Sequence, residues 1–216
     1  IEKPHPKEDN VYYNFKDLVE AMNGNKNGTF KIGADLNATN VPTPKKWYVD
    51  GDFKGTLKSV EGKHYTIHNT ERPLFKNIIG GTVTKVNLGN VNINMPWADR
   101  IAPIADTIKG GAKIEDVKVT GNVLGRNWVS GFIDKIDNQG TLRNVAFIGN
   151  VTAVGDGGQY LTGIVGENWK GLVEKAYVDA NLIGDKAKAA GIAYSSHYGG
   201  DNGAVSRDGA IKKSVA

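Results

Sequence analysis

The chain has 216 residues, a formal net charge of +4 and no cysteine, which excludes a disulfide framework and a thiolate metal site. Its lysines are spread along the whole chain, so no basic face indicates nucleic-acid binding. No apolar run approaches the roughly 20 residues that a membrane-spanning helix needs, and we expect no membrane insertion in this segment. The 28 glycines and short bursts of β-branched residues favour many strands joined by turns.

The first predicted element is a short helix over residues 14–22. Asn14 suits a helix N-cap, and four apolar residues share one helical face, namely Phe15, Leu18, Val19 and Met22. The first strand is expected from Phe30 to Leu36. A β-helix leaves an open edge at its end, so we expect this helix to cap the first turn.

A segment of about 30 residues then recurs along the chain. Five versions of it are GGTVTKVNLGNV from Gly80, GAKIEDVKVTGNV from Gly111, GTLRNVAFIGNV from Gly140, GLVEKAYVDANL from Gly171 and GAIKKSVA from Gly209. A Pro or Gly before an apolar pair keeps the same period, at Pro73, Pro103, Gly131, Gly163 and Gly191. A unit of this length made only of short strands predicts an all-β fold, a right-handed parallel β-helix of about five to six turns. A propeller, whose blades need about 40 residues or more, is the alternative.

Aligning the repeats predicts which side chains stack from turn to turn. Two inward columns are expected, one of Val86, Val117, Val145 and Ala176 and one of Leu88, Val119, Phe147 and Val178. An asparagine column of Asn90, Asn122, Asn150 and Asn181 follows small residues at a corner that needs left-handed backbone. Stacked asparagine amides can bond to one another along the axis.

One surface column combines cations and aromatic rings, at Arg100, Trp128, Tyr160 and Lys188. The residues one position later are apolar and should point inward, at Ile101, Val129, Leu161 and Ala189. Exposed aromatic rings flanked by cations suit a peptide or sugar partner, so this column is the candidate substrate-binding face. The alternative is that Trp128 and Tyr160 merely pack over turns.

The last repeat carries an insertion, from Tyr194 to Ser206, that is predicted to be a protruding loop. Its Tyr194, His197 and Tyr198 complete the candidate binding residues. The loop is equally compatible with a spacer that has no function.

No catalytic residue and no metal ligand is predicted. Asp106 and Asp134 occupy equivalent positions in successive repeats, and we interpret them as a solvated surface column because the next repeat has Gly166 there. His64 and His68 lack an accompanying Glu and lie in a strand-like run, so we interpret them as partly exposed strand histidines.

The opening FKDLVEAM and GTFKIGADLNA, the GKHYTIHN segment from Gly62 and the PLFKNI-then-GTVTKVNL layout resemble the N-terminal, Gly-rich repeat region of Gram-positive immunoglobulin A proteases. The resemblance covers roughly residues 11–216. It implies a streptococcal zinc metalloprotease that is large, exported and tethered to the cell wall. In that family the zinc belongs to a C-terminal module with a His-Glu-x-x-His helix, a motif that this chain lacks.

The resemblance implies a non-catalytic accessory domain that positions or recognises immunoglobulin A or another host glycoprotein and is joined to the other domains of its parent protease. We expect an extension over residues 1–13, a β-helix domain over 14–216 that stops in mid-repeat, and an export signal outside this segment. No cofactor is expected here. A spacer or adhesin module and a carbohydrate-active β-helix enzyme are the alternatives.

Overall fold

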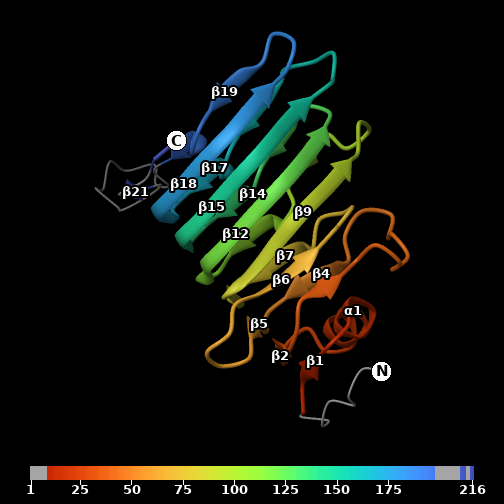
Figure 1. Ribbon diagram of the computed structural model, residues 1–216. Coiled ribbons are helices and arrows are strands. Elements are labelled where there is room, and N and C mark those ends of the chain that lie inside the picture. Colours follow the sequence, from red (N-terminus) through yellow and green to blue (C-terminus); the bar gives the residue numbers. More distant parts are fainter. Residues whose placement is uncertain (1–8, 198–209, 213–214) are drawn as a thin grey trace.

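The computed structural model describes residues 9–197, 210–212 and 215–216, and it confirms the parallel β-helix. Strands from successive turns lie side by side and pair in parallel, so the chain climbs from the helix near its N-terminus toward its C-terminus (Figure 1). Within the described part the six-stranded sheet marks six turns. The predicted propeller alternative is wrong, because every turn is continued by its neighbours along one axis.

Three sheets form the walls of the solenoid. The long-strand sheet contains β1 (Val11–Tyr12), β2 (Thr29–Ile32), β3 (Leu36–Asn37), β5 (Thr56–Ser59), β6 (Tyr65–His68), β8 (Thr82–Thr84), β9 (Val86–Asn94), β12 (Ala112–Gly125), β15 (Gly140–Ala153), β18 (Leu172–Ile183) and β21 (Ala210–Lys212). The four-stranded sheet contains β10 (Arg100–Ile101), β13 (Trp128–Ser130), β16 (Tyr160–Thr162) and β19 (Lys188–Ala190). The six-stranded sheet contains β4 (Val49–Phe53), β7 (Phe75–Ile79), β11 (Ala105–Lys109), β14 (Ile133–Asp137), β17 (Val165–Trp169) and β20 (Ala193–His197).

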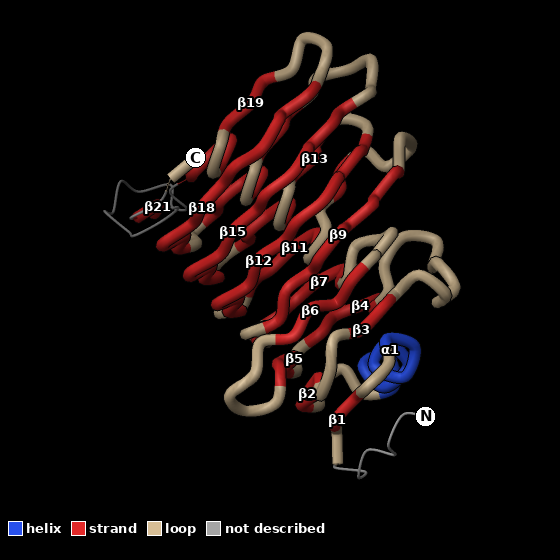
Figure 2. The backbone as a smooth tube through the Cα atoms, viewed as in Figure 1, coloured by secondary structure: helices blue, strands red, loops and turns tan. Residues whose placement is uncertain are grey.

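The predicted capping helix is α1 (Phe15–Gly24), which lies at the first turns beside β4 (Figure 2). Asn14 is its N-cap, because the side-chain oxygen accepts a 2.9 Å hydrogen bond from the backbone N–H of Asp17. The helix buries Phe15, Leu18 and Met22, as its apolar face predicted. It ends two residues later than expected, and the single strand predicted over 30–36 is divided between β2 and β3.

The two predicted inward columns are confirmed, since each of their members is buried and the strands pair in the expected register. Phe147, at the centre, has no exposed surface. The apolar residues that follow the surface column were also expected to point inward. Ile101, Val129 and Leu161 are buried as predicted, but Ala189 is exposed on the last strand of the four-stranded sheet. Apolar side chains therefore stack on apolar side chains from turn to turn and form one continuous core.

The asparagine column is confirmed except at its first member. Asn150 donates to Asn122 at 2.7 Å and Asn181 to Asn150 at 2.9 Å, but Asn92 rather than Asn90 aligns with Asn122. β9 has an extra residue between Leu88 and Val91, a bulge that shifts its register. Asn90 instead donates to Asn69. Asn90 has the predicted left-handed backbone, with a φ of +48°, whereas in the next two repeats the positive φ falls on Gly121 and Gly149 and not on the asparagines that follow them.

Candidate binding face

The predicted surface column exists as a ladder on the four-stranded sheet. Arg100 pairs in register with Trp128, Trp128 with Tyr160, and Tyr160 with Lys188. Equivalent side chains of neighbouring strands lie about 5 Å apart, which brings aromatic rings into stacking distance. The strand register therefore positions these side chains on one line parallel to the solenoid axis.

The rings and cations of this line are in direct contact. Trp128 and Tyr160 stack with their centroids 4.2 Å apart and their planes 19° from parallel. The Arg100 guanidinium lies 4.3 Å from the Trp128 centroid, and the Lys188 ammonium lies 5.6 Å from that of Tyr160. Strand order places Arg100 and Tyr160 on opposite sides of Trp128, so both faces of this indole are covered.

Tyr194 completes the stack, although it was predicted to lie in a protruding loop. It belongs to β20, whose backbone pairs with β17. Its ring makes edge contacts with Trp128 at 5.5 Å and with Tyr160 at 4.8 Å. The loop prediction is wrong for Tyr194 because the insertion begins only after the strand is complete. Of His197 only the backbone, at the end of β20, is described, and Tyr198 lies outside the described residues.

We call Arg100, Trp128, Tyr160, Lys188 and Tyr194 the cation–aromatic ladder. Arg100 is held in place at the N-terminal end of the ladder, because its Nε donates to Asp134 at 2.7 Å and its Nη2 donates to Glu167 at 2.7 Å. Both carboxylates come from the six-stranded sheet, one and two turns further along the axis. Burial by itself would lower the pKa of Arg100, but the two carboxylates raise it above its ordinary value. The guanidinium thus joins the two sheets across their corner.

The interpretation of Asp106 and Asp134 as a solvated column is wrong. The two residues are equivalent in register, but the Asp134 side chain is only 6% exposed and that of Asp106 19%. Burial raises the pKa of Asp134 to about 6, against the opposing effect of Arg100. Burial also raises the pKa of Asp106, which forms a 3.6 Å ion pair with Lys46. The sequence pattern missed this because the residues that cover the pair come from other sheets and loops.

Gly166 ends the acidic column for a steric reason. A Cβ there would lie 2.6 Å from the backbone oxygen of Asp134 and 3.4 Å from the Trp128 ring. The missing side chain keeps clear of the Asp134 backbone oxygen, and the Trp128 ring lies beside this glycine.

Asp106 and Asp134 line a hollow of about 420 Å³ together with Lys46, Asp99, Arg100, Thr107 and Lys135. The Oδ1 atoms of Asp106 and Asp134 are buried without a hydrogen-bond partner, whereas glycoside hydrolysis needs two carboxyl groups that reach the substrate. Among the described residues no group of three or more His, Asp or Glu side chains is placed to hold a metal ion. His64 bonds to Asn87 at 2.9 Å, and the pair of His64 and His68 does not fit a zinc site. Trp128, Tyr160 and Tyr194 are partly exposed, the Arg100 side chain is 33% exposed, and Lys188 is exposed.

Sequence reasoning missed a second aromatic cluster below the ladder. Trp47, in the loop between β3 and β4, has Lys46 4.9 Å and Lys76 4.8 Å from its centroid. Trp97, in the turn between β9 and β10, is 59% exposed. A tryptophan directly after Pro96 is a turn signal with a large ring at its tip, and this signal was available in the sequence.

Comparison with known proteins agrees with the fold and the repeat pattern. Residues 1–121 match the family described as the M26 IgA1-specific metallo-endopeptidase N-terminal region. The zinc metalloprotease ZmpB of Streptococcus pneumoniae serotype 4 is 42% identical over 199 residues, which cover 92% of this chain and 10% of that protein. An immunoglobulin A1 protease of Streptococcus pneumoniae is 37% identical over 154 residues, covering 70% of this chain and 8% of the relative. The chain thus spans about a tenth of the length of the curated relatives it matches.

Two solved structures share the architecture. A structure of an IgA1 protease superposes with a TM-score of 0.78 at 29% identity and covers 88% of this chain and 16% of that chain. A putative immunoglobulin A1 protease from Bacteroides ovatus gives a TM-score of 0.62 at 16% identity over 94% of this chain and 74% of its own, a likeness of fold alone. Among the described residues no helix is both long and apolar enough to span a membrane. With more than half of its length matched by the family, the chain belongs to the N-terminal region of the M26 IgA1-specific metallo-endopeptidases.

Proposed function

We propose that this chain is a non-catalytic accessory region of a secreted, cell-wall-associated bacterial zinc metalloprotease, and that its cation–aromatic ladder recognises or positions an immunoglobulin A substrate. Residues 14–216 form the β-helix domain in this proposal, and residues 1–13 form an extension before it. The zinc and the peptide-bond chemistry belong to the catalytic module of the parent protein. The names of the curated relatives support immunoglobulin A as the substrate, with another host glycoprotein as the alternative.

The observation that carries the proposal is the rigid order of the ladder. Register, stacking and the two carboxylates on Arg100 hold the side chains in place before a partner arrives, so binding loses little side-chain entropy. Tyr, Trp and Arg are the side chains that dominate protein interfaces. The partly exposed rings, Arg100 and Lys188 then offer a narrow, mixed apolar and cationic strip along the axis.

The test is biolayer interferometry of the chain against intact immunoglobulin A. Replacing Trp128 and Tyr160 together by Ala is expected to abolish specific binding, since it removes the centre of the strip. Lys188→Ala, which leaves the inner stack intact, is expected to weaken binding by about threefold to tenfold. Lys186→Ala is the matched control, because Lys186 is also exposed but lies outside the ladder, in the short loop just before β19. Equal binding by Lys188→Ala and Lys186→Ala would contradict a contact at the ladder.

A spacer function is the second candidate, and the closed stack favours it. Both faces of Trp128 are covered by the ladder itself, so the rings stabilise the corner even without any ligand. If the unsubstituted chain does not bind immunoglobulin A at high micromolar concentration, the recognition proposal fails and the spacer function is preferred. The two functions thus predict opposite outcomes in one measurement.

A further inference from the structure

A separate hollow lies below the ladder, between the loop that joins β3 to β4 and the turn that joins β9 to β10. Its volume is about 720 Å³, within the range of small-molecule sites. The residues that line it are Asn23, Pro44, Lys45, Lys46, Trp47, Tyr48, Asp50, Trp97, Ala98 and Asp99. Its three aromatic rings, Trp47, Tyr48 and Trp97, distinguish it from four other hollows of the described residues, which together contain one aromatic ring of this kind, Tyr177.

Trp97 is the open aromatic surface of this hollow. Met95, two residues before it, and Ala98, directly after it, are buried, and the Ala98 N–H donates to the Met95 carbonyl at 2.9 Å, so Pro96 and Trp97 form the exposed tip of this turn. At 59% exposed, this ring is the most open tryptophan surface that the structure describes. It contrasts with Trp128, which is sealed on both faces.

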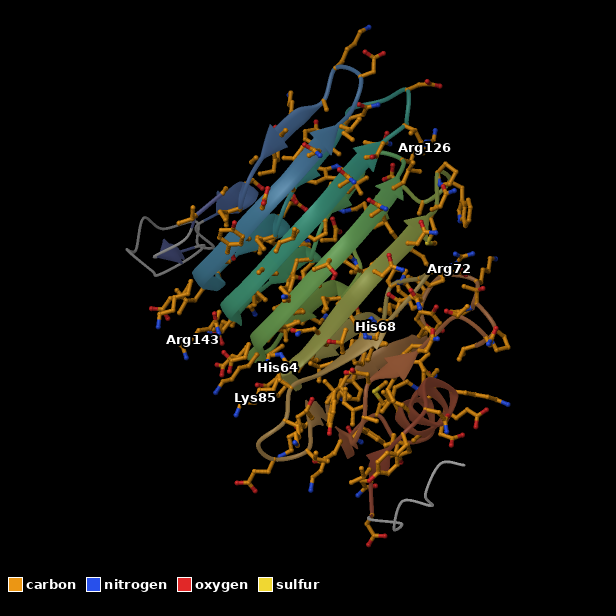
Figure 3. The ribbon with its side chains drawn as sticks, in the orientation of Figure 1. His64, His68, Arg72, Lys85, Arg126 and Arg143 are labelled. Carbon is orange, nitrogen blue, oxygen red and sulfur yellow. The ribbon has the colours of Figure 1, made fainter. Side chains whose placement is uncertain are left out.

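Arg72 fixes the position of the Trp97 ring. Its guanidinium lies 5.6 Å from the Trp97 centroid, and its Nε donates to the Pro44 carbonyl at 3.2 Å. Arg72 lies on the loop side of the strands, away from Lys85 and Arg143 at their other ends (Figure 3). One side chain therefore ties the two walls of the hollow together and supports the ring before any ligand binds.

The polar groups of the hollow are balanced in charge. The charged side chains that line it are two lysines and two aspartates, namely Lys45, Lys46, Asp50 and Asp99, and Lys46 also pairs with Asp106 just outside the lining. A strongly charged ligand of either sign would be repelled by two of these side chains. An uncharged ligand with many hydroxyl groups can instead donate hydrogen bonds to the carboxylates and accept them from the lysines. A pyranose ring combines such hydroxyls with an apolar C–H face that packs on an indole.

We propose that this hollow is a carbohydrate-binding site for uncharged oligosaccharides of hexose or N-acetylhexosamine, with Trp97 as the stacking platform. The site binds sugar without cleaving it. Its aromatic platform is distinct from the ladder, because Trp97 and Arg72 are not ladder residues, and the two sites adjoin where the backbone carbonyl of Asp99 accepts a 2.8 Å hydrogen bond from the Trp128 N–H. A glycan-binding site of this kind would attach the region to a glycosylated surface or glycoprotein.

The experiment is isothermal titration calorimetry of the chain with lactose, N-acetyllactosamine and triacetylchitotriose at millimolar concentrations. Saturation-transfer NMR would identify the sugar protons in contact with the protein. Lactose and N-acetyllactosamine represent animal-type glycans, and triacetylchitotriose represents N-acetylglucosamine polymers. Binding of at least one neutral sugar is expected, with Trp97→Ala about tenfold weaker or more and Trp97→Phe intermediate.

Tyr177→Ala is the control, since Tyr177 is a 47% exposed aromatic residue of β18 outside the hollow. It should bind sugar like the parent, and the melting temperature of Trp97→Ala should match that of the parent because the ring is mostly exposed. Absence of binding for all three sugars, or sugar binding that survives Trp97→Ala, would overturn the proposal. Loss of sugar binding with immunoglobulin binding retained would leave the ladder proposal intact, so the two can fail separately.

Discussion

Replacing Gly149 by Ala is expected to lower the free energy of unfolding by about 3 kcal/mol or more. Gly149 has a φ of +151° in the middle of β15, and an added Cβ would overlap the carbonyl oxygen of Gly121 on the neighbouring strand. The overlap is with backbone, and the paired strands on both sides prevent it from moving away. Urea unfolding followed by circular dichroism would measure the loss.

Ala180→Gly is the matched control for this prediction. Ala180 stands next to Gly149 in the same column, but it already carries a Cβ and is only partly buried. Its replacement should cost about 1 kcal/mol or less. If Gly149→Ala were as mild as Ala180→Gly, the close approach of the two glycines would not be required by the fold.

Asp134→Asn is expected to stabilise the protein at pH 7.5 by about 2 kcal/mol and to flatten its dependence on pH. Burial raises the folded-state pKa of Asp134 to about 6, whereas an unfolded Asp titrates near pH 3.9. The folded state therefore binds the proton more tightly. The stability that this group contributes is fully present below about pH 4 and is lost as the pH rises through about 6. Asn resembles the protonated carboxyl group and needs no desolvation of a charge, while Arg100 keeps its bond to Glu167.

The measurement is the free energy of unfolding of parent and variant in urea at several pH values between 4 and 7.5. The difference between the two curves isolates Asp134, because other titrating groups contribute to both. Asp179→Asn, at an exposed position of β18, is the control and should follow the parent curve. A difference that stays constant from pH 4 to 7.5 would show that Asp134 does not titrate in this range.

The repeat alignment predicted the period of the solenoid, its inward columns and every ladder position except that of Tyr194, which was expected in a loop. These features depend on the stacking of equivalent residues from one turn to the next, which a repeat alignment already contains. The columns through Phe147 and through Trp128 could therefore be predicted residue by residue. The helical cap was predictable for a similar reason, since its N-cap and apolar face are local.

The arrangement between the columns depends on contacts that the repeat pattern does not contain. The bulge in β9 places Asn92, and not Asn90, beside Asn122, because one extra residue shifts the register of the strand that follows it. Asp134 is buried where Arg100, from another sheet, donates to it. The contrast between the sealed Trp128 and the open Trp97 depends on the loops around them. A repeat pattern specifies the order of residues along the axis. The angle between the sheets and the paths of the loops are set by contacts between residues far apart in sequence. Those contacts decide which side chains remain accessible.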